Sequence, residues 1–444
     1  MTFADLNLNT PLLNALDDLG YSVPTTIQQK AFPVVMSGRD MCGIAQTGTG
    51  KTFAYLLPCL RQWKYAKDRL PQILIMVPTR ELVVQVVEAA KKLGKYTSLE
   101  VVGVFGGVNM KPQAAAVQNG ADIIVATPGR LMDLAYNGAL KLKNIKRLVI
   151  DEVDEMMNLG FRTQLNNVLD LLPPKRQNLM FSATITDEVE KLMNTYFDLP
   201  IRIEAAPTGT PLENIDQTRY DVPNFYTKIN LLTRLLQDDE SMSKVLVFVA
   251  TKSMADDVYE QMVTVFPEKV GVIHSNKEQN HRFNTVNQFQ SGNYRFIIAT
   301  DIIARGLDVA EVTHVVNFDT PDVPENYMHR IGRTGRADKK GISITFTTEK
   351  EKEYLEAIET LMNFKIPVLP LPEDLEISEL LTEDEKPKFR MKTDILPRLP
   401  KREPGGGAFH EKKEKNKKVN IKVRHVDKMK EKYGKPKTRG GKKK

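Results

Sequence analysis

Short runs of aliphatic residues recur along the first two hundred positions, and longer amphipathic stretches separate them. Each run has four to six apolar residues that do not alternate with polar ones, which is typical of parallel strands buried on both faces. Stretches such as RELVVQVVEAAKKLGK, from Arg80, have the spacing of helices. The pattern predicts an α/β fold with a doubly wound parallel sheet. The runs are ILIMVPT from Ile73, VVGVFGG from Val101, DIIVATPG from Asp122, RLVIDE from Arg147 and NLMFSAT from Asn178.

The pattern pauses and then restarts. Residues 204–217 (EAAPTGTPLENIDQ) are rich in Pro, Gly and Thr, which indicates an interdomain linker. A chain of 444 residues also exceeds what one hydrophobic core usually supports. We therefore expect a first domain at 1–207, a linker at 208–217, a second α/β domain at 218–370 and a C-terminal extension at 371–444. The second set of runs is KVLVFVAT, KVGVIHS, RFIIATD, THVVNFD and ISITFTT.

The charge is concentrated at the C-terminal end. Residues 401–444 contain 18 Lys and Arg against 5 Asp and Glu, a net charge of +13, whereas residues 1–400 contain 45 against 51, a net charge of −6. The basic segment has few apolar residues and no helical period, so it is expected to be a disordered polycation that binds nucleic acid. Only Cys42 and Cys59 occur, which favours neither a disulfide framework nor a zinc site. Without an export signal or a long apolar run, a soluble, cytoplasmic protein with no membrane association is expected.

The stretch AQTGTGKT, Ala45 to Thr52, follows an apolar run and precedes a helical pattern. Its glycines would let backbone N–H groups surround phosphates at a helix N-terminus, with Lys51 on the terminal phosphates and Thr52 on Mg²⁺. The stretch has Ala45 where the usual phosphate-binding loop has glycine. A simple glycine-rich turn is the alternative.

The stretch LVIDEVDEM brings four carboxylates directly after a buried strand. A magnesium nucleotide site needs one carboxylate for the metal and a second for the attacking water, and Asp151 and Glu152 fit these roles. An acidic helix start is the alternative, and Glu155 is expected to be no more than such helix-cap charge. A phosphate-binding loop about one hundred residues upstream favours the nucleotide site.

The stretch HRIGRTGR, His329 to Arg336, lies in the second domain. Arg333 and Arg336 have the placement of arginine fingers, which stabilise charge on a transferring phosphoryl group. A basic surface turn is the alternative. Because the phosphate-binding loop belongs to the first domain, these arginines would make hydrolysis depend on closure of the two domains.

Taken in order, these motifs resemble the full set of the DEAD-box RNA helicases, of the bacterial type, with DEVD in place of DEAD. The resemblance covers about residues 1–365 and rests on GYSVPTTIQ with Phe3 upstream, AQTGTGKT, PTREL, GG, TPGR, DEVD, SAT, VLVFVATK, ATDIIARGLD and HRIGRTGR. It implies two RecA-like domains that close around ATP, Mg²⁺ and RNA. It also implies ATP-dependent separation of short RNA duplexes.

The resemblance assigns roles to individual residues. Those implied to contact the nucleotide are Phe3, Tyr21, Gln28, Ala45, Gln46, Thr47, Gly48, Thr49, Gly50, Lys51, Thr52 and Asp308. Those implied to contact the RNA backbone are Pro78, Thr79, Arg80, Gly106, Gly107, Thr127, Gly129, Arg130, Arg282, Thr300 and Asp301. Asp154, Ser182, Ala183, Thr184 and His329 are implied to couple the two sites.

The sequence departs from the family pattern at three positions: Val153 replaces Ala, Thr26 replaces a common Pro, and Ser275 replaces a common Gly. The ionisable groups are all present, so activity is still expected. A DNA helicase or translocase and a non-catalytic RNA clamp are the alternative functions. The expected partners are single-stranded and duplex RNA, with ribosomal or messenger ribonucleoprotein as candidates, and the protein is expected to be a monomer.

Overall fold

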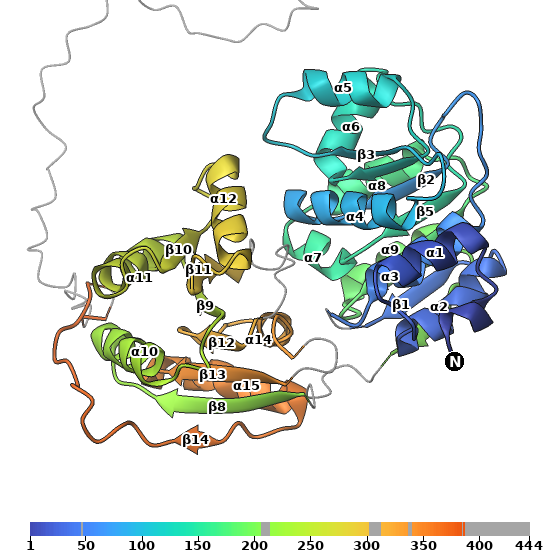
Figure 1. Cartoon of the computed structure of the whole chain (residues 1–444). Helices are drawn as coiled ribbons and strands as arrows, with labels where there is room; N and C mark the ends of the chain where they lie inside the picture. The colour runs from blue at the N-terminus through green and yellow to red at the C-terminus, as the bar shows by residue number, and fades with distance from the viewer. Residues whose placement is uncertain (46–47, 206–213, 302–311, 336–339, 384, 387–444) are drawn as a thin grey trace, which may run out of the picture. The chain divides into compact units, whose positions relative to one another are not determined.

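A computed structural model describes residues 1–45, 48–205, 214–301, 312–335, 340–383 and 385–386. Two parallel sheets, each of seven strands, form the framework (Figure 1). The first has the order β3-β4-β2-β5-β6-β1-β7. Its strands are β1 (Met41–Ile44), β2 (Ile73–Met76), β3 (Val101–Val104), β4 (Ile123–Ala126), β5 (Arg147–Ile150), β6 (Gln177–Ser182) and β7 (Ile201–Glu204).

Helices cover both faces of the first sheet, because neighbouring residues of each buried strand point to opposite sides. Ile73 and Ile75 join the core beneath α1 to α4, whereas Leu74 and Met76 join the core beneath α5 to α9. The first group is η1 (Phe3–Leu6), α1 (Thr10–Asp18), α2 (Thr26–Met36), α3 (Lys51–Arg61) and α4 (Arg80–Leu93). The second is α5 (Met110–Gln118), α6 (Pro128–Tyr136), α7 (Val153–Asn158), α8 (Arg162–Leu171) and α9 (Asp187–Tyr196).

The second sheet has the order β10-β11-β9-β12-β13-β8-β14. All ten apolar runs form strands, which confirms the predicted α/β class, but β7, β8 and β14 were not foreseen. β8 begins at Ile215, so the end of the predicted linker lies in a strand. Residues 208–213 of the linker lie outside the described part of the chain. The domain limits stay a prediction. The strands are β8 (Ile215–Asp221), β9 (Val245–Val249), β10 (Val270–Ile273), β11 (Phe296–Thr300), β12 (His314–Asn317), β13 (Gly341–Thr347) and β14 (Val368–Leu369).

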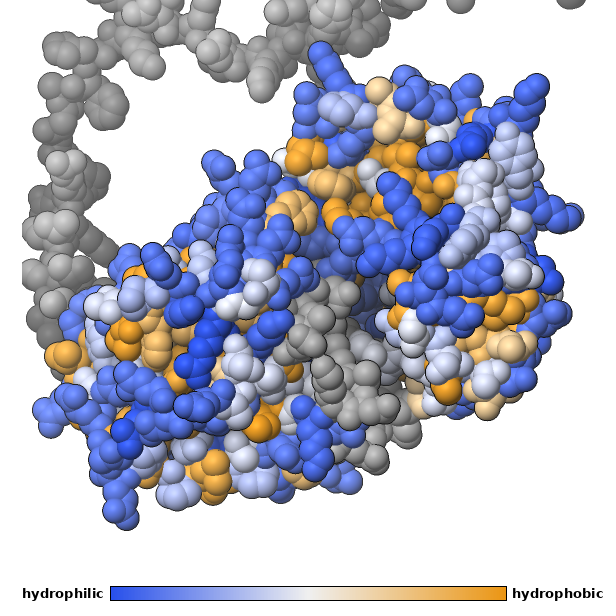
Figure 2. Space-filling model, in the orientation of Figure 1, coloured by the Kyte–Doolittle hydropathy of each residue, from blue (hydrophilic) through white to orange (hydrophobic). Residues whose placement is uncertain are grey.

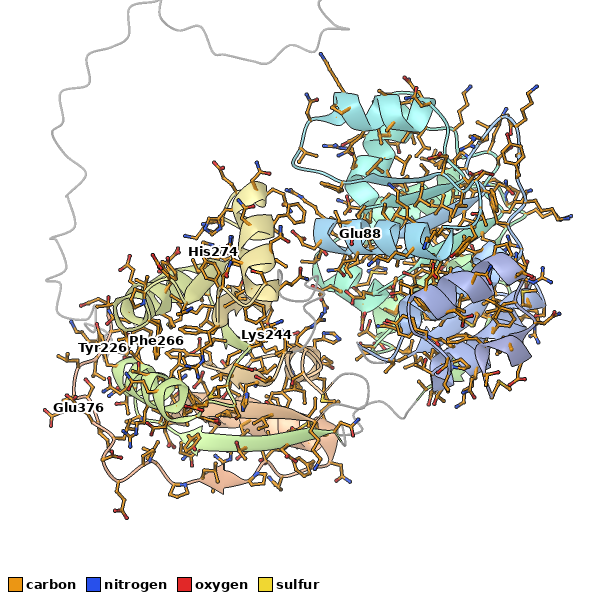
Figure 3. The ribbon with its side chains drawn as sticks, viewed as in Figure 1. Glu88, Tyr226, Lys244, Phe266, His274 and Glu376 are labelled. Carbon is orange, nitrogen blue, oxygen red and sulfur yellow. The ribbon has the colours of Figure 1, made fainter. Side chains whose placement is uncertain are left out.

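Helices also cover both faces of the second sheet. The core beneath α10 and α11 includes Tyr226 and Phe266 at its margin (Figure 3), and separate cores form beneath α12 and beneath α14 and α15. The helices are α10 (Phe225–Asp238), α11 (Lys252–Val265), α12 (Gln279–Gln290), α14 (Pro324–Ile331), η2 (Glu349–Glu351) and α15 (Lys352–Met362).

The start of the C-terminal extension is bound to the second domain. The Ser378 backbone N–H donates to the Thr227 hydroxyl at 3.0 Å, and the Asn230 amide donates to the backbone carbonyl of Glu376 at 2.9 Å; Glu376 is labelled in Figure 3. Residues 371–383 therefore run along α10. The basic segment from 401 lies outside the described residues, so its predicted disorder is untested.

The face in Figure 2 is mostly hydrophilic, and its apolar areas are small and separate. Cys42 and Cys59 are buried, and burial raises the pKa of their thiols to about 11 and about 12. Among the described helices, none has both the length and the apolar character that a membrane span requires.

A buried charge cluster joins α10 to the ends of β12 and β13. The Lys228 ammonium lies 3.0 Å from carboxylate oxygens of both Asp319 and Glu351, and Asp319 also accepts the backbone N–H of Ala250 at 2.9 Å. Burial alone lowers the pKa of Lys228, but the two carboxylates outweigh it and the pKa is raised. The cluster holds the loop after β9 beside the loop after β12.

Replacing Lys228 with Met would leave Asp319 and Glu351 buried without their cation. We expect Lys228→Met to lower the free energy of unfolding by about 3 to 5 kcal/mol, measured by urea unfolding of the full chain. Arg162→Met is the control, because Arg162 and Glu188 form an exposed pair and its loss is expected to cost no more than about 0.5 kcal/mol. Equal effects of the two changes would contradict a structural role for the cluster.

Candidate active site and nucleic-acid cleft

The described end of the turn between β1 and α3 has the glycine conformations that a phosphate-binding loop needs. Gly48 and Gly50 have φ of 83° and 87°, a region that favours glycine, and Gly50 caps the N-terminus of α3. A Cβ on Gly50 would lie 2.5 Å from the Gln28 amide nitrogen. Gln46 and Thr47 lie outside the described residues. The glycine at position 50 is therefore required both by conformation and by space.

Lys51 lies at the start of α3 and is buried, and its ammonium has no hydrogen-bond partner among the described residues. A buried cation without a partner is costly unless an anion joins it. The adjoining cavity measures about 430 Å³, and a helix N-terminus opens into it. These features suit a bound phosphate chain. The cavity is lined by Phe3, Tyr21, Val23, Thr25, Gln28, Gly48, Gly50, Lys51, Thr52, Phe53, Leu82, Gln85, Val86, Ala89, Asp151, Glu152 and Arg333.

The far end of this cavity is aromatic. Tyr21 and Phe53 pack edge to face with their ring centroids 5.3 Å apart. The Gln28 side chain is buried: its oxygen accepts the Thr25 backbone N–H at 2.9 Å and its amide donates to the Gly50 carbonyl at 3.1 Å. Each of these groups keeps one further hydrogen-bonding position. Gln28 thus ties the aromatic end of the cavity to the phosphate-binding turn, and it has the capacity left for a base edge.

Two acids follow β5 at the carboxyl edge of the sheet. Asp151 is 5% exposed, and burial is the main reason why its pKa is raised, although Lys51 opposes the shift. Burial also raises the pKa of Glu152 to about 7, against the opposing charge of Lys51. Glu152 has φ 52° and ψ 50°, a conformation that residues other than glycine rarely adopt. Backbone strain is thus stored at the residue predicted to act on water.

The side chains at this edge fit a magnesium ion. The pKa values of Asp151 and Glu152 stay raised although Lys51 opposes the shifts, so the nearby positive charge does not offset burial, and hard divalent cations prefer oxygen ligands. Thr52 and Asp151 both line the cavity that adjoins Lys51. They are the residues that could hold the metal, with the hydroxyl of one and the carboxylate of the other.

Asp154 is held by the predicted SAT stretch. One carboxylate oxygen accepts the backbone N–H groups of Ala183 and Thr184 at 3.1 and 3.0 Å and the Thr184 hydroxyl at 3.0 Å. The Ser182 hydroxyl in turn donates to the Thr184 carbonyl at 2.6 Å. Burial tends to raise the pKa of Asp154, but His329, Lys51 and Thr184 outweigh it, so the pKa is lowered. Asp154 is therefore a fixed anion that connects β6 to the acids after β5.

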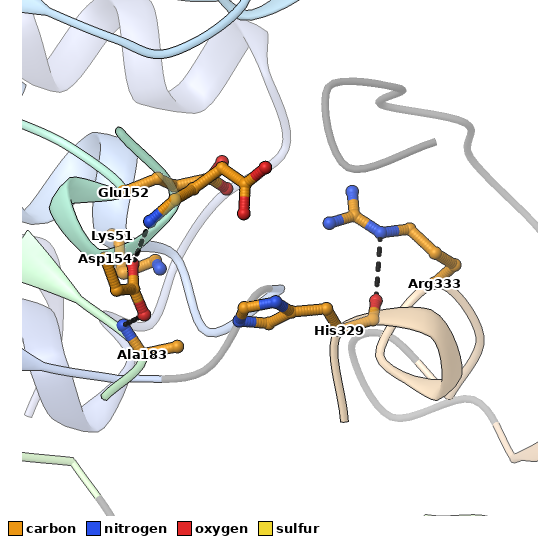
Figure 4. A pocket seen from close by; sticks show the side chains of 7 residues that line it. Lys51, Glu152, Asp154, Ala183, His329 and Arg333 are labelled. Atoms are coloured by element: carbon orange, nitrogen blue, oxygen red, sulfur yellow. Dashed lines mark hydrogen bonds between the residues drawn. The ribbon is translucent and has the colours of Figure 1, made fainter. Parts of the chain in front are cut away.

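A small cavity brings together residues from elements beside both sheets. It is lined by Lys51, Glu152, Asp154, Glu155, Ala183, His329 and Arg333. Figure 4 shows the His329 ring pointing toward Asp154 and Ala183. The Arg333 Nε donates to the His329 carbonyl at 3.3 Å, and Arg333 also lines the nucleotide cavity. The predicted association of His329 and Arg333 with the acids is thus present, whereas Arg336 and Asp308 lie outside the described residues.

A second cavity, of about 820 Å³, lies at the edge formed by the PTREL, GG and TPGR turns. The predicted RNA contacts Thr300 and Asp301 are not among its lining residues. Its lining consists of Pro78, Thr79, Arg80, Glu81, Gly106, Gly107, Val108, Thr127, Gly129, Arg130, Asp133, Leu159, Phe161, Ser275, Lys277, Glu278, Gln279, Asn280 and Arg282. Nine of the eleven predicted RNA contacts therefore lie together.

Several of these side chains already have protein partners. Arg130 is buried and donates to Gln113 at 3.0 Å and to the Val108 carbonyl at 2.8 Å, so it supports the glycine loop. Gly107 has φ 76°, and a Cβ there would lie 2.0 Å from the Arg80 guanidinium. Asp301 accepts from the Arg330 guanidinium at 2.8 Å. Arg130 and Asp301 thus hold neighbouring elements in place in this structure.

The sequence analysis missed a hydrogen-bonded group in the second cavity. Gln279 accepts from Arg80 at 3.2 Å and donates to Glu81 at 2.9 Å, and Arg282 forms an ion pair with Glu81. The spacing of three between Gln279 and Arg282 on a helix was the available signal. Glu155 lies in the first turn of α7, as expected of a helix-cap charge, but it is only 1% exposed.

Comparisons with known proteins agree with this geometry. The DEAD/DEAH box helicase profile matches residues 25–192, and the helicase conserved C-terminal domain profile matches residues 227–338. RNA helicase CrhR of Synechocystis sp. is 39% identical over 371 residues, which make up 84% of this chain and 75% of that protein. DEAD-box ATP-dependent RNA helicase 24 of Oryza sativa subsp. japonica is 40% identical over 358 residues, 80% of this chain, and the chain spans only 46% of that relative.

A solved structure of S. cerevisiae Dbp5 bound to RNA and ADP BeF3 is similar, with a TM-score of 0.76 and 30% identity. The match covers 83% of this chain and 96% of that chain. Two parallel sheets, a phosphate-binding turn and buried acids after β5 are therefore found in a chain whose sequence matches helicases over most of its length. The chain belongs to the DEAD-box family of ATP-dependent RNA helicases.

Proposed function

We propose that ATP with Mg²⁺ binds between the phosphate-binding turn and Arg333, and that RNA binding favours the arrangement in which this site is complete. One observation carries the proposal: Lys51, Glu152 and Asp154, at helices α3 and α7 beside the first sheet, line one cavity with His329 and Arg333, at and after helix α14 beside the second. A site that needs both domains can hydrolyse ATP only when they are together. RNA in a cavity lined by residues of both domains would stabilise the same state.

The residues divide the chemistry between them. Lys51 binds the terminal phosphates, and Thr52 and Asp151 hold the metal, which supplies charge neutralisation on the phosphate oxygens when it is bound. Glu152 accepts the proton of the attacking water, and Arg333 stabilises the charge on the transferring phosphoryl group. Asp154 stays ionised, and its negative charge orients the His329 ring, which lines the same cavity. Arg336 and Asp308 are proposed as second arginine finger and ribose contact on the resemblance alone.

RNA recognition is proposed for the cavity at the PTREL, GG and TPGR turns. Arg80 and Lys277 supply positive charge there. The turn at Gly106 and Gly107 lacks side chains, so the RNA backbone can approach it closely. Single-stranded RNA would pass through this cavity, and short duplexes would be opened locally. The basic segment 401–444 would act as a tethered RNA anchor of no sequence preference. Action on ribosomal or messenger ribonucleoprotein, as a cytoplasmic monomer, is a proposal that rests on composition and charge.

The catalytic roles are separable by mutation. Glu152→Gln is expected to abolish ATP turnover and to retain Mg-ATP binding, because the amide keeps the shape but accepts no proton. Lys51→Ala is expected to weaken ATP binding itself. Steady-state hydrolysis and fluorescent-nucleotide titration measure the two effects. Unchanged hydrolysis in Glu152→Gln would remove Glu152 from this role and would favour a clamp that needs only binding.

Burial of Glu152 also predicts a pH dependence of stability. A carboxyl whose pKa rises from 4.5 in the unfolded chain to about 7 in the folded one destabilises the fold as it ionises, so the free energy of unfolding falls as pH rises through this window. Gln cannot ionise. In the nucleotide-free protein, Glu152→Gln should therefore gain about 1 to 3 kcal/mol relative to wild type between pH 4.5 and pH 8. If the difference in unfolding free energy between Glu152→Gln and wild type did not change with pH, the pKa of Glu152 would be the same in the folded and the unfolded chain, and the prediction would be wrong.

Replacing Arg333 tests whether ATP turnover depends on closure of the two domains. We expect Arg333→Ala to lose about 10³-fold in RNA-stimulated ATP turnover, the lower range for an arginine finger, and to bind RNA normally without nucleotide. Arg162→Ala, at an exposed pair with Glu188, is the matched control and should keep full stimulation. Retained stimulation in Arg333→Ala would mean that the second domain contributes no charge to the reaction.

A further inference from the structure

Tyr55 is a buried side chain that the proposed mechanism does not use. It lies on α3, three residues after Thr52, and these positions are neighbours on one helix face. The side chain is 0% exposed, and its ring packs on Phe181 with centroids 5.4 Å apart. Phe181 follows Met180, the register partner of Ile150, so Phe181 and Asp151 occupy adjacent positions on neighbouring strands. The fold thus brings the ring of Tyr55 to the end of β5.

The hydroxyl of Tyr55 is polar, buried and poorly satisfied. It makes no hydrogen bond of ordinary length and angle among the described residues. The side chains of Asp151 and Thr52 nevertheless interact with it. A buried hydroxyl whose hydrogen bonding is incomplete destabilises the folded protein. Phenylalanine would fill the same space without that cost, so the hydroxyl is expected to gain its partner in another state of the site.

We propose that Tyr55 is a positioning residue for the metal: its hydroxyl donates a hydrogen bond to the Asp151 carboxylate and fixes which oxygen faces Mg²⁺. This inference rests on the proposed metal site at Thr52 and Asp151. Groups that hydrogen-bond to metal ligands orient them and strengthen metal binding. Hydrogen bonds of this kind are often long in the unliganded protein and shorten in the complex. Binding of metal would thus convert a loose contact into a full hydrogen bond.

The effect must pass through Asp151. Tyr55 is not among the residues that line the nucleotide cavity, whereas Asp151 and Thr52 both are. Removal of the hydroxyl should therefore weaken metal binding and leave metal-free nucleotide binding unchanged. A general packing defect would not separate these two quantities.

Tyr55→Phe tests the inference in the full chain. We expect the affinity for Mn²⁺ in the presence of ADP, measured by electron paramagnetic resonance, to fall about 10-fold. ADP affinity in excess chelator should not change. The melting temperature of the nucleotide-free variant should be equal to or higher than that of wild type, because no ordinary hydrogen bond is lost. Wild-type Mn²⁺ affinity in a folded Tyr55→Phe protein would overturn the inference.

Two further variants keep the outcome unambiguous. Tyr327→Phe removes a buried hydroxyl that donates to Gln217 at 3.0 Å, so it should lower the melting temperature and leave Mn²⁺ affinity unchanged. If Tyr55→Phe lowers the melting temperature as much as Tyr327→Phe does, the Tyr55 hydroxyl is structural and the inference is wrong.

Asp151→Asn should weaken Mn²⁺ binding more than Tyr55→Phe. If Asp151→Asn binds Mn²⁺ with wild-type affinity, the proposed metal site is wrong. If Asp151→Asn binds Mn²⁺ more weakly but Tyr55→Phe keeps wild-type affinity, the metal site stands and the role of Tyr55 is wrong.

Discussion

Burial of negative charge at the end of β5 is the constraint on which the rest of the site depends. Asp151, Asp154 and Glu155 are each at most 5% exposed, within five consecutive positions. Such a cluster is tolerable only if cations and N–H donors surround it. The cation is Lys51 on α3, which acts through its charge, and the donors are the backbone N–H groups of Ala183 and Thr184 after β6. The nucleotide-binding turn, the acids and the SAT stretch therefore form one electrostatic unit.

Parallel strand order makes this unit possible. β5 lies between β2 and β6, and β1 follows β6, so the carboxyl ends of four neighbouring strands open at one edge. The cores on both faces of the sheet hold these strands in register. Val153, the departure that gives DEVD, is 0% exposed and joins the core beneath α5 to α9. The extra methyl groups are thus accommodated by packing, on the side away from α3.

Buried charged residues beside the second sheet form a connected set of contacts. Arg330 is 2% exposed and is held by Asp301 and by the Asp319 carbonyl, at 2.8 and 2.7 Å. Asp319 is in turn paired with Lys228. This chain of contacts fixes the helix that bears His329 and leads to Arg333. Rigid support of this kind would hold the geometry of Arg333, which is itself buried and donates to the His329 carbonyl.

The sequence by itself determined the fold class and the strand runs, because buried parallel strands require particular residues at fixed local spacing. It also predicted Lys51, Asp151 and Glu152 as residues of a nucleotide site, and these roles stay a prediction. Only the tertiary structure decided which partners each charge has. Arg130 supports the glycine loop, Arg282 pairs with Glu81, and Asp301 pairs with Arg330. These partners lie up to 201 positions apart in sequence, and no local pattern specifies a contact that depends on how strands, helices and turns meet in space.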